Sequence, residues 1–85
     1  VSPNPFSSST SVVFQSPGLS SMTFQVFDIA GRLVRTQSIG NSPAGQHTIT
    51  WDGRDSQGAE LASGVYFIRL RGAEQQASAK VLLVR

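Results

Sequence analysis

The chain has 85 residues, of which 39% are apolar and 14% are charged, and it contains no cysteine. A chain of this length is expected to form a single domain over residues 1–85, with a modest core that neither disulfide bonds nor a thiolate metal site can reinforce. Its formal net charge of +2 comes from basic residues scattered between Arg32 and Arg85. This scatter argues against nucleic-acid binding, which needs a concentrated basic face.

The first part of the chain predicts an extended opening and two strands. Residues 4–6 are restricted to an extended conformation by proline, and residues 10–14 form a strand with its alternate residues on one face. Pro and Gly at the centre of residues 16–19 predict a type II turn. Residues 22–26 then alternate between apolar and polar side chains, which is typical of a half-buried strand.

The middle of the chain continues this pattern of strands and turns. Residues 28–31 have Asp first and Gly fourth, which is the signature of a type I turn. The returning strand is predicted over residues 32–39, with Leu33 or Val34 as its inward anchor. After a further turn that contains proline, residues 47–51 alternate again and predict another strand.

The most strongly β segment covers residues 65–71 and follows a third turn at residues 55–58. Every even position from 66 to 70 is apolar, and Val65 and Phe67 make the opposite face partly apolar as well. We therefore expect this strand to lie at the centre of a sheet and to be covered on both faces near its start.

The last segment admits two interpretations. Ala73, Ala77, Val81 and Val84 fall at near-helical spacing, but residues 81–84 are short and rich in β-formers, and an isolated helix of this length would be marginal. We predict a strand here. With about seven short strands separated by turns, the chain is predicted to be an all-β, immunoglobulin-like sandwich of antiparallel strands.

One group of carboxylates invites a metal-binding interpretation. Asp52, Asp55 and Glu60 cluster around two glycines, and oxygen-rich loops of this kind can hold calcium. Their spacing does not match an EF-hand loop, and aspartate at the start of a turn also caps its own backbone. We therefore interpret them as turn formers, keep Asp52 and Asp55 as the alternative metal ligands, and predict no cofactor.

Catalytic residues are not indicated by the sequence. The single histidine, His47, lies in an alternating strand, where a packed position is the ordinary expectation. The serines lie in low-complexity runs without a nucleophile elbow, and the carboxylates at 52 and 55 share a turn instead of facing each other across a cleft. We expect a protein that is not an enzyme and has no small-molecule substrate.

Carbohydrate binding is an alternative function for a small β-sandwich. Sugar rings stack on exposed aromatic side chains, but five of the aromatic residues here are Phe, which more often packs in cores. Trp51 shares the parity of Ile49, so we expect it in the core. Phe27 opposes the inward parity of its strand and is the better candidate for an exposed apolar position.

Several motifs, in order along the whole chain, carry a family resemblance. They are Ser2 to Phe6, Phe27 to Val34, Trp51 to Gly58 with Ser63 to Leu70, and Lys80 to Arg85. The motifs resemble the Ig-like domain of FlgD-type flagellar hook-capping proteins. The opening is also similar to the start of the C-terminal sorting domains of the type IX secretion system.

The resemblance implies a module at the C-terminus of a secreted multidomain bacterial protein, behind an upstream catalytic domain. Such a module directs export across the outer membrane and attachment to the cell surface, so the implied partners are the outer-membrane secretion machinery or cell-surface components. We expect that machinery to recognise the terminal strand by strand addition; its residues are Lys80, Val81, Leu82, Leu83, Val84 and Arg85. The residues expected to set the fold are Asp28, Gly31, Trp51, Asp55, Gly58, Gly64 and Tyr66.

Two other functions remain open at this point. One is a passive spacer or assembly domain of the hook-cap type. The other is a carbohydrate-binding module that uses Trp51 or Phe27 as its platform. Surface delivery of a fused reporter would identify sorting, and retention on insoluble polysaccharide would identify carbohydrate binding.

Overall fold

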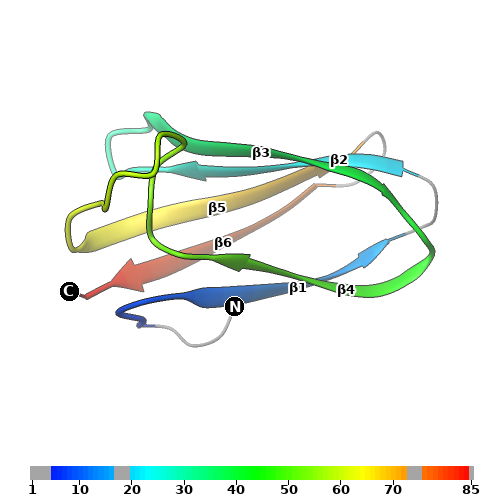
Figure 1. Ribbon diagram of the computed structural model, residues 1–85, viewed down its shortest axis with the longest axis horizontal. Coiled ribbons are helices and arrows are strands. Elements are labelled where there is room, and N and C mark those ends of the chain that lie inside the picture. The colour runs from blue at the N-terminus through cyan, green and yellow to red at the C-terminus, as the bar shows by residue number, and fades with distance from the viewer. Residues whose placement is uncertain (1–4, 17–19, 73–75, 85) are drawn as a thin grey trace.

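The computed structural model describes residues 5–16, 20–72 and 76–84, and these ranges contain strands but no helix (Figure 1). The strands are β1 (Thr10–Ser16), β2 (Ser20–Phe27), β3 (Leu33–Ser42), β4 (Gly45–Trp51), β5 (Gly64–Gly72) and β6 (Gln76–Leu83). β1 and β4 form a two-stranded sheet, and the other four form a sheet in the order β3-β2-β5-β6. All of these pairs are antiparallel. The prediction of an all-β, sandwich-like fold is therefore confirmed.

The extended opening of the chain does not form a seventh strand in the described residues. Phe6 makes an isolated parallel bridge to the end of β6. Its N–H donates to the Leu82 carbonyl at 2.9 Å, and the Val84 N–H donates to the Phe6 carbonyl at 2.8 Å. After this single bridge the chain crosses to β1 in the other sheet. The part of the chain that the structure describes thus contains six strands where about seven were predicted.

The core lies between the two sheets and is built from alternate residues of each strand. Its largest fully buried side chains are Trp51, Phe24, Ile68, Leu70, Leu83, Val26 and Val81. Each apolar side chain of this size contributes about 1.5–3 kcal/mol when it is removed from water. In β3 the inward anchor is Val34, because the register shifts between Val26 and Phe27 and leaves Leu33 exposed.

The final segment is a strand, as predicted. β6 pairs with β5 along its length, and it buries Val81 and Leu83 while Lys80 and Leu82 lie on the other face. This two-residue period excludes the helical interpretation of the described part. Other predicted features lie outside the described residues, namely the opening motif at 2–4, the centre of the turn at 16–19, and positions 73 and 85.

β5 lies at the centre of the four-stranded sheet, between β2 and β6. The expectation that it is covered on both faces is wrong. Tyr66, Ile68 and Leu70 are buried on the inner face, but Phe67 on the outer face is 41% exposed. The reason is that the two-stranded sheet packs against the inner face alone.

In the described residues, no helix is long and apolar enough to cross a membrane.

Candidate functional site

The first predicted aspartate turn joins β2 to β3. Asp28 Oδ1 accepts hydrogen bonds from the N–H groups of Ala30 and Arg32, both at 2.9 Å, and Gly31 has a φ of 85°, which favours glycine. The Arg32 Nε lies 2.9 Å from Asp28 Oδ2. The backbone N–H of Arg32, aided by the Arg32 guanidinium and the Ala30 N–H, holds the pKa of Asp28 below its ordinary value of 3.8.

The second aspartate turn has the same geometry and lies between β4 and β5. Asp55 Oδ1 accepts hydrogen bonds from the N–H groups of Gln57 and Ala59, both at 2.9 Å. The Gly58 N–H donates to the Asp55 carbonyl at 3.1 Å, and Gly58 has a φ of 87°. Both turns therefore place their carboxylate oxygens on the backbone of the turn itself.

The carboxylates near Asp55 point to separate partners. Asp52 Oδ1 accepts a hydrogen bond from the Arg54 N–H at 3.2 Å and lies 3.5 Å from Arg35 Nη1. Glu60 Oε1 lies 3.4 Å from Arg54 Nη2. Within the described ranges, no three acidic, histidine or cysteine side chains gather at one point that could hold a metal ion. The arrangement is one of turns and ion pairs.

Trp51 occupies the centre of the core and is 0% exposed. Its ring centroid lies 5.4 Å from that of Phe6 and 5.5 Å from that of Tyr66, and its Nε1 donates to the Arg54 carbonyl at 3.0 Å. Tyr66 in turn donates from its hydroxyl to the Ala62 carbonyl at 2.7 Å. A buried indole offers no platform for a sugar ring, so Trp51 has a structural role in this fold.

His47 lies in β4 and is half-buried, in line with the packed position expected for it. Its Nε2 is 2.7 Å from the Pro43 carbonyl oxygen, and its ring packs against Phe14 with a centroid distance of 5.7 Å. Both ring contacts are explained by local packing in β1 and β4.

The predicted recognition strand is divided by the structure. Lys80, Val81, Leu82 and Leu83 lie in β6, Val84 follows it, and Arg85 lies outside the described residues. The outward backbone edge of this strand bonds to Phe6 at Leu82 and Val84. An added strand would have to displace Phe6 at that end.

Gly64, which was predicted to set the fold, begins β5 opposite Leu83.

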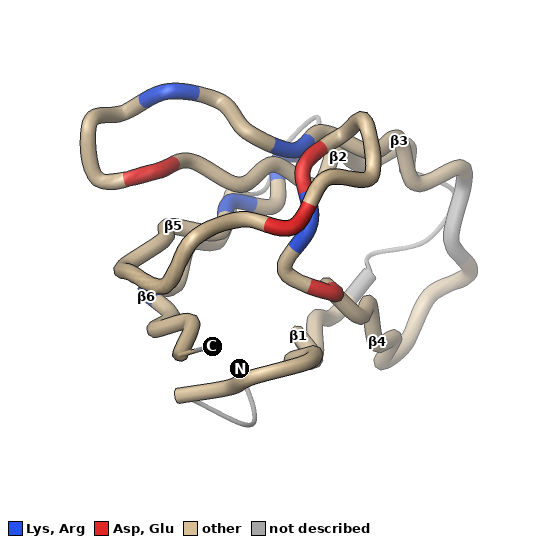
Figure 2. The backbone as a smooth tube through the Cα atoms, turned by 60° about the vertical axis from the view of Figure 1, so that its left-hand side comes forward, with Lys and Arg blue, Asp and Glu red and all other residues tan. Residues whose placement is uncertain are grey.

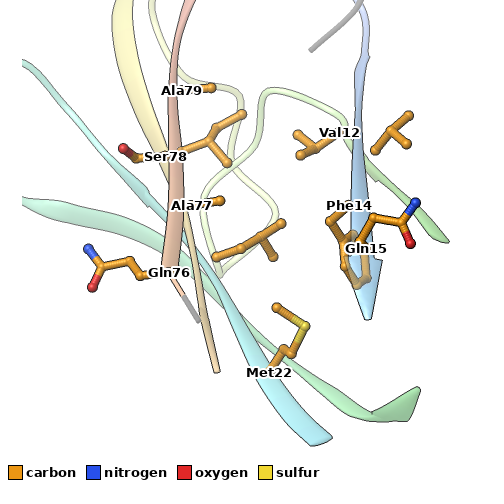
Figure 3. Close-up of a pocket in the computed structure, with 11 residues that line it drawn as sticks. Val12, Phe14, Gln15, Met22, Gln76, Ala77, Ser78 and Ala79 are labelled. Carbon is orange, nitrogen blue, oxygen red and sulfur yellow. The ribbon is translucent and has the colours of Figure 1, made fainter. Parts of the chain in front are cut away.

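A groove of about 610 Å³ opens between β1 and β6, where neither strand pairs with another strand on that side. Figure 3 shows Val12 and Phe14 on one wall, Ala77 and Ala79 on the other, and Met22 at one end. The remaining lining residues are Val13, Gln15, Ile68, Leu70, Gln76 and Ser78. All of the lining side chains are uncharged, and the groove is hollow because its β6 wall carries alanines.

The outer face of the four-stranded sheet carries an apolar row, of which Phe27 alone was predicted as an exposed apolar position. Leu33 pairs with Phe27, Phe27 pairs with Phe67, and Phe67 pairs with Lys80, which makes one row across all four strands. Directly paired residues of an antiparallel sheet point to the same side. The apolar parity of Val65 and Phe67 was the available signal, but it was interpreted as double coverage of β5.

Charge is distributed unevenly over the molecule. The acidic residues of the described ranges lie in the connections between β2 and β3 and between β4 and β5, where Figure 2 shows them in red. The basic residues Arg69, Arg71 and Lys80 lie within β5 and β6. Arg69 has its guanidinium carbon 4.7 Å from the centre of the Phe27 ring. Asp28, Asp52 and Glu60 thus form ion pairs with Arg32, Arg35 and Arg54, whereas the other three basic residues of the described ranges lie within the four-stranded sheet.

Known proteins resemble this chain in sequence and in fold. It is 43% identical over 49 residues to the basal-body rod modification protein FlgD of Salmonella typhimurium, an alignment that covers 58% of this chain and 21% of that protein. A crystal structure of FlgD from Xanthomonas campestris, described as informative on the hook capping essential for flagellar assembly, has a TM-score of 0.71 and 26% identity. It covers 93% of this chain and 58% of that chain.

A third similar structure carries information about the fold alone. Dimeric latent PorU from Porphyromonas gingivalis has a TM-score of 0.79 at 22% identity, and the match covers 98% of this chain and 9% of that chain. The chain spans about a fifth of the length of the curated relatives it matches.

These comparisons correct the function predicted from the sequence. The prediction of a type IX sorting domain that directs export and surface attachment is wrong, because the sequence relatives and the hook-capping structure are FlgD proteins. The hook-cap alternative fits these findings better. Residues 3–76 match the FlgD Ig-like domain family, and the chain therefore belongs to that family.

Proposed function

We propose that this chain is a non-catalytic assembly module of a FlgD-type protein that acts in flagellar hook capping. The observation that carries the proposal is the match of residues 3–76 to the FlgD Ig-like domain. The names of the relatives support it, since one is a basal-body rod modification protein and another is described by its part in hook capping. Because the chain spans only part of these relatives, the activity of the whole protein belongs to the proposal.

The geometry of the described residues supports a role in contact and not in catalysis. Asp28 and Asp55 use their carboxylates to hold turns, and Trp51 is inside the core. The features that remain available to a partner are surfaces: the groove beside β6 and the outer face of the four-stranded sheet. We expect such a module to work by holding neighbouring proteins in position. Its location outside the cell stays a prediction.

The test is a strain in which the codons for residues 5–84 are deleted from the parent gene. We expect hooks to be missing or malformed in electron micrographs and swimming to be lost, while immunoblots show the shortened parent protein at its normal level. Normal hooks in this strain would contradict the proposal.

A second strain separates assembly from passive spacing. In it, residues 5–84 are replaced by an unrelated immunoglobulin-like domain of similar length, which keeps the spacing and removes this surface. An assembly module predicts defective hooks in this strain too. Normal hooks here, together with defective hooks after deletion, would identify a spacer.

A further inference from the structure

The outer face of the four-stranded sheet is divided into an apolar half and a polar half. The outer apolar patch consists of Phe27, Leu33, Val65, Phe67 and Leu82. Within it, Leu33 is 48% exposed, Phe67 41% and Leu82 40%. The other half of the same face carries Thr23, Gln25, Gln76 and Ser78 together with Arg69 and Arg71, as expected for a sheet face that meets water.

This division shows that the apolar residues are not a requirement of the fold. The polar half is part of the same strands and pairs in the same ladders, so uncharged polar side chains satisfy this face equally well. A contiguous apolar patch on the surface of a soluble domain marks a contact site far more often than isolated apolar residues do. The patch spans all four strands, because Leu33 belongs to β3, Phe27 to β2, Phe67 to β5 and Leu82 to β6.

The charged residues of this face have one sign. Arg69, Arg71 and Lys80 point to the same side as Phe67, as the ladder of β5 and β6 shows. In the described part of the face there is no acidic residue, and the nearest one along the chain, Asp28, is already paired with Arg32. Carboxylates on a partner that meets this face would be attracted by these basic side chains.

One of these cations is held in place before any partner binds. Gln25 Oε1 accepts hydrogen bonds from Arg69 Nε at 3.2 Å and from Arg69 Nη2 at 3.0 Å. The same guanidinium lies over the Phe27 ring, 4.7 Å from its centre. A guanidinium that is fixed on an aromatic ring loses little freedom when a carboxylate binds to it. The edge of the outer apolar patch is thus preorganised for an anion.

We propose that the outer face is a docking surface for a protein segment that combines apolar side chains with carboxylates. The apolar side chains pack on the outer apolar patch, and the carboxylates meet Arg69 and Lys80 at its edge. The inference does not depend on the proposed role in hook capping, since it rests on the register, exposure and charge of this face.

The probe is a phage-displayed library of random peptides, selected on the immobilised full chain. We expect the enriched peptides to be rich in Asp and Glu together with Leu, Ile and Phe. Their affinity should fall by about tenfold or more in Phe67→Ser and in Leu82→Ser, and it should fall at higher salt. Lys80→Glu should weaken the same peptides several-fold.

The matched control is Val13→Ser, because Val13 is an exposed apolar residue, 54% exposed, on the other sheet. It should leave the affinity unchanged. The melting temperature of each variant is measured to confirm that the variant is folded. Two independent patch variants are used so that misfolding of one does not decide the result.

Three results would overturn the inference. One is enrichment of basic or uncharged peptides, and another is that no peptide depends on Phe67 or Leu82. The third is sedimentation showing that the chain associates with itself through this face, which would make a second copy the occupant. Each of these can occur whether or not the deletion strain loses its hooks, so the two proposals fail separately.

Discussion

The two faces of the four-stranded sheet are made by the same strands, but one face is buried and the other is exposed to solvent. Ile68 and Phe67 are neighbours in β5 and both are large and apolar, yet Ile68 is 1% exposed and Phe67 41%. Their position relative to the period of the strand decides the difference, since successive side chains point to opposite faces. Hydrophobicity therefore indicates which residues avoid water, but the face on which a side chain lies, and whether another sheet covers that face, decide which residues are buried.

The largest expected effect is the difference in unfolding free energy between variants of these two residues. Ile68→Ala should lower the free energy of unfolding by about 2–5 kcal/mol, because it leaves a cavity in the core. Phe67→Ala should lower it by less than about 1 kcal/mol, because the ring is exposed. Urea denaturation of both variants measures the pair. Equal losses would mean that the outer face is covered in solution.

The comparison is sharpened by the connection between β4 and β5, which is one of those that carry the chain from one sheet to the other. Asp55→Ala removes the acceptor of the Gln57 and Ala59 N–H groups and should lower the free energy of unfolding by about 1–2 kcal/mol. Asp55→Asn, the matched control, keeps an oxygen acceptor and should lose less. If the two variants unfold at the same urea concentration, the turn is not held by this oxygen.

A smaller effect is expected from a single polar atom at the border of the inner face. Tyr66→Phe removes the hydroxyl that donates to the Ala62 carbonyl at 2.7 Å and leaves the ring packing on Trp51 unchanged. We expect a loss of about 0.5–1.5 kcal/mol in thermal or chemical unfolding. A loss as large as that of Ile68→Ala would show that the hydroxyl supports more of the core than this bond.

The smallest effect is a pH dependence at the exposed end of the sheet. The pKa of Asp28 is lowered in the fold, so its ionised form contributes stability above the ordinary value of 3.8, and this is lost as pH falls through the lowered pKa. The melting temperature of Asp28→Asn should lie below that of the native chain at pH 6, and the gap should close towards pH 2. A gap that does not change with pH would show that the Asp28 charge is not the cause.

Much of the fold could be predicted from the sequence because burial in a strand has a period of two residues. The inward sets of β2 and β5 follow directly from that period. Residue parity could not show that Phe67 stays exposed, since it does not reveal whether a further layer covers the outer face of the sheet. The choice of Val34 over Leu33 as the inward residue depends on a shift in strand register, which parity does not reveal. The bridge from Phe6 to β6 joins residues that are far apart in the sequence, so no local pattern predicts it.

The function was harder to predict for a related physical reason. The motif residues Asp28, Asp55 and Trp51 are used for turns and for the core. Any immunoglobulin-like domain with these turns needs such residues, so they could not separate a sorting domain from a hook-cap domain. The outer apolar patch is made by other residues of the same motifs, such as Phe27 and Phe67, on the sheet face that the core does not use.

The pairing of Phe6 with the end of β6 has a mechanical consequence. The two segments run in parallel, and they are joined by the bonds from Phe6 N–H to the Leu82 carbonyl and from Val84 N–H to the Phe6 carbonyl. A force that pulls the two ends of the chain apart loads both bonds at once, in shear, and cannot open them one after the other. A domain tied in this way would resist being unravelled from its ends better than one whose end bonds open one at a time.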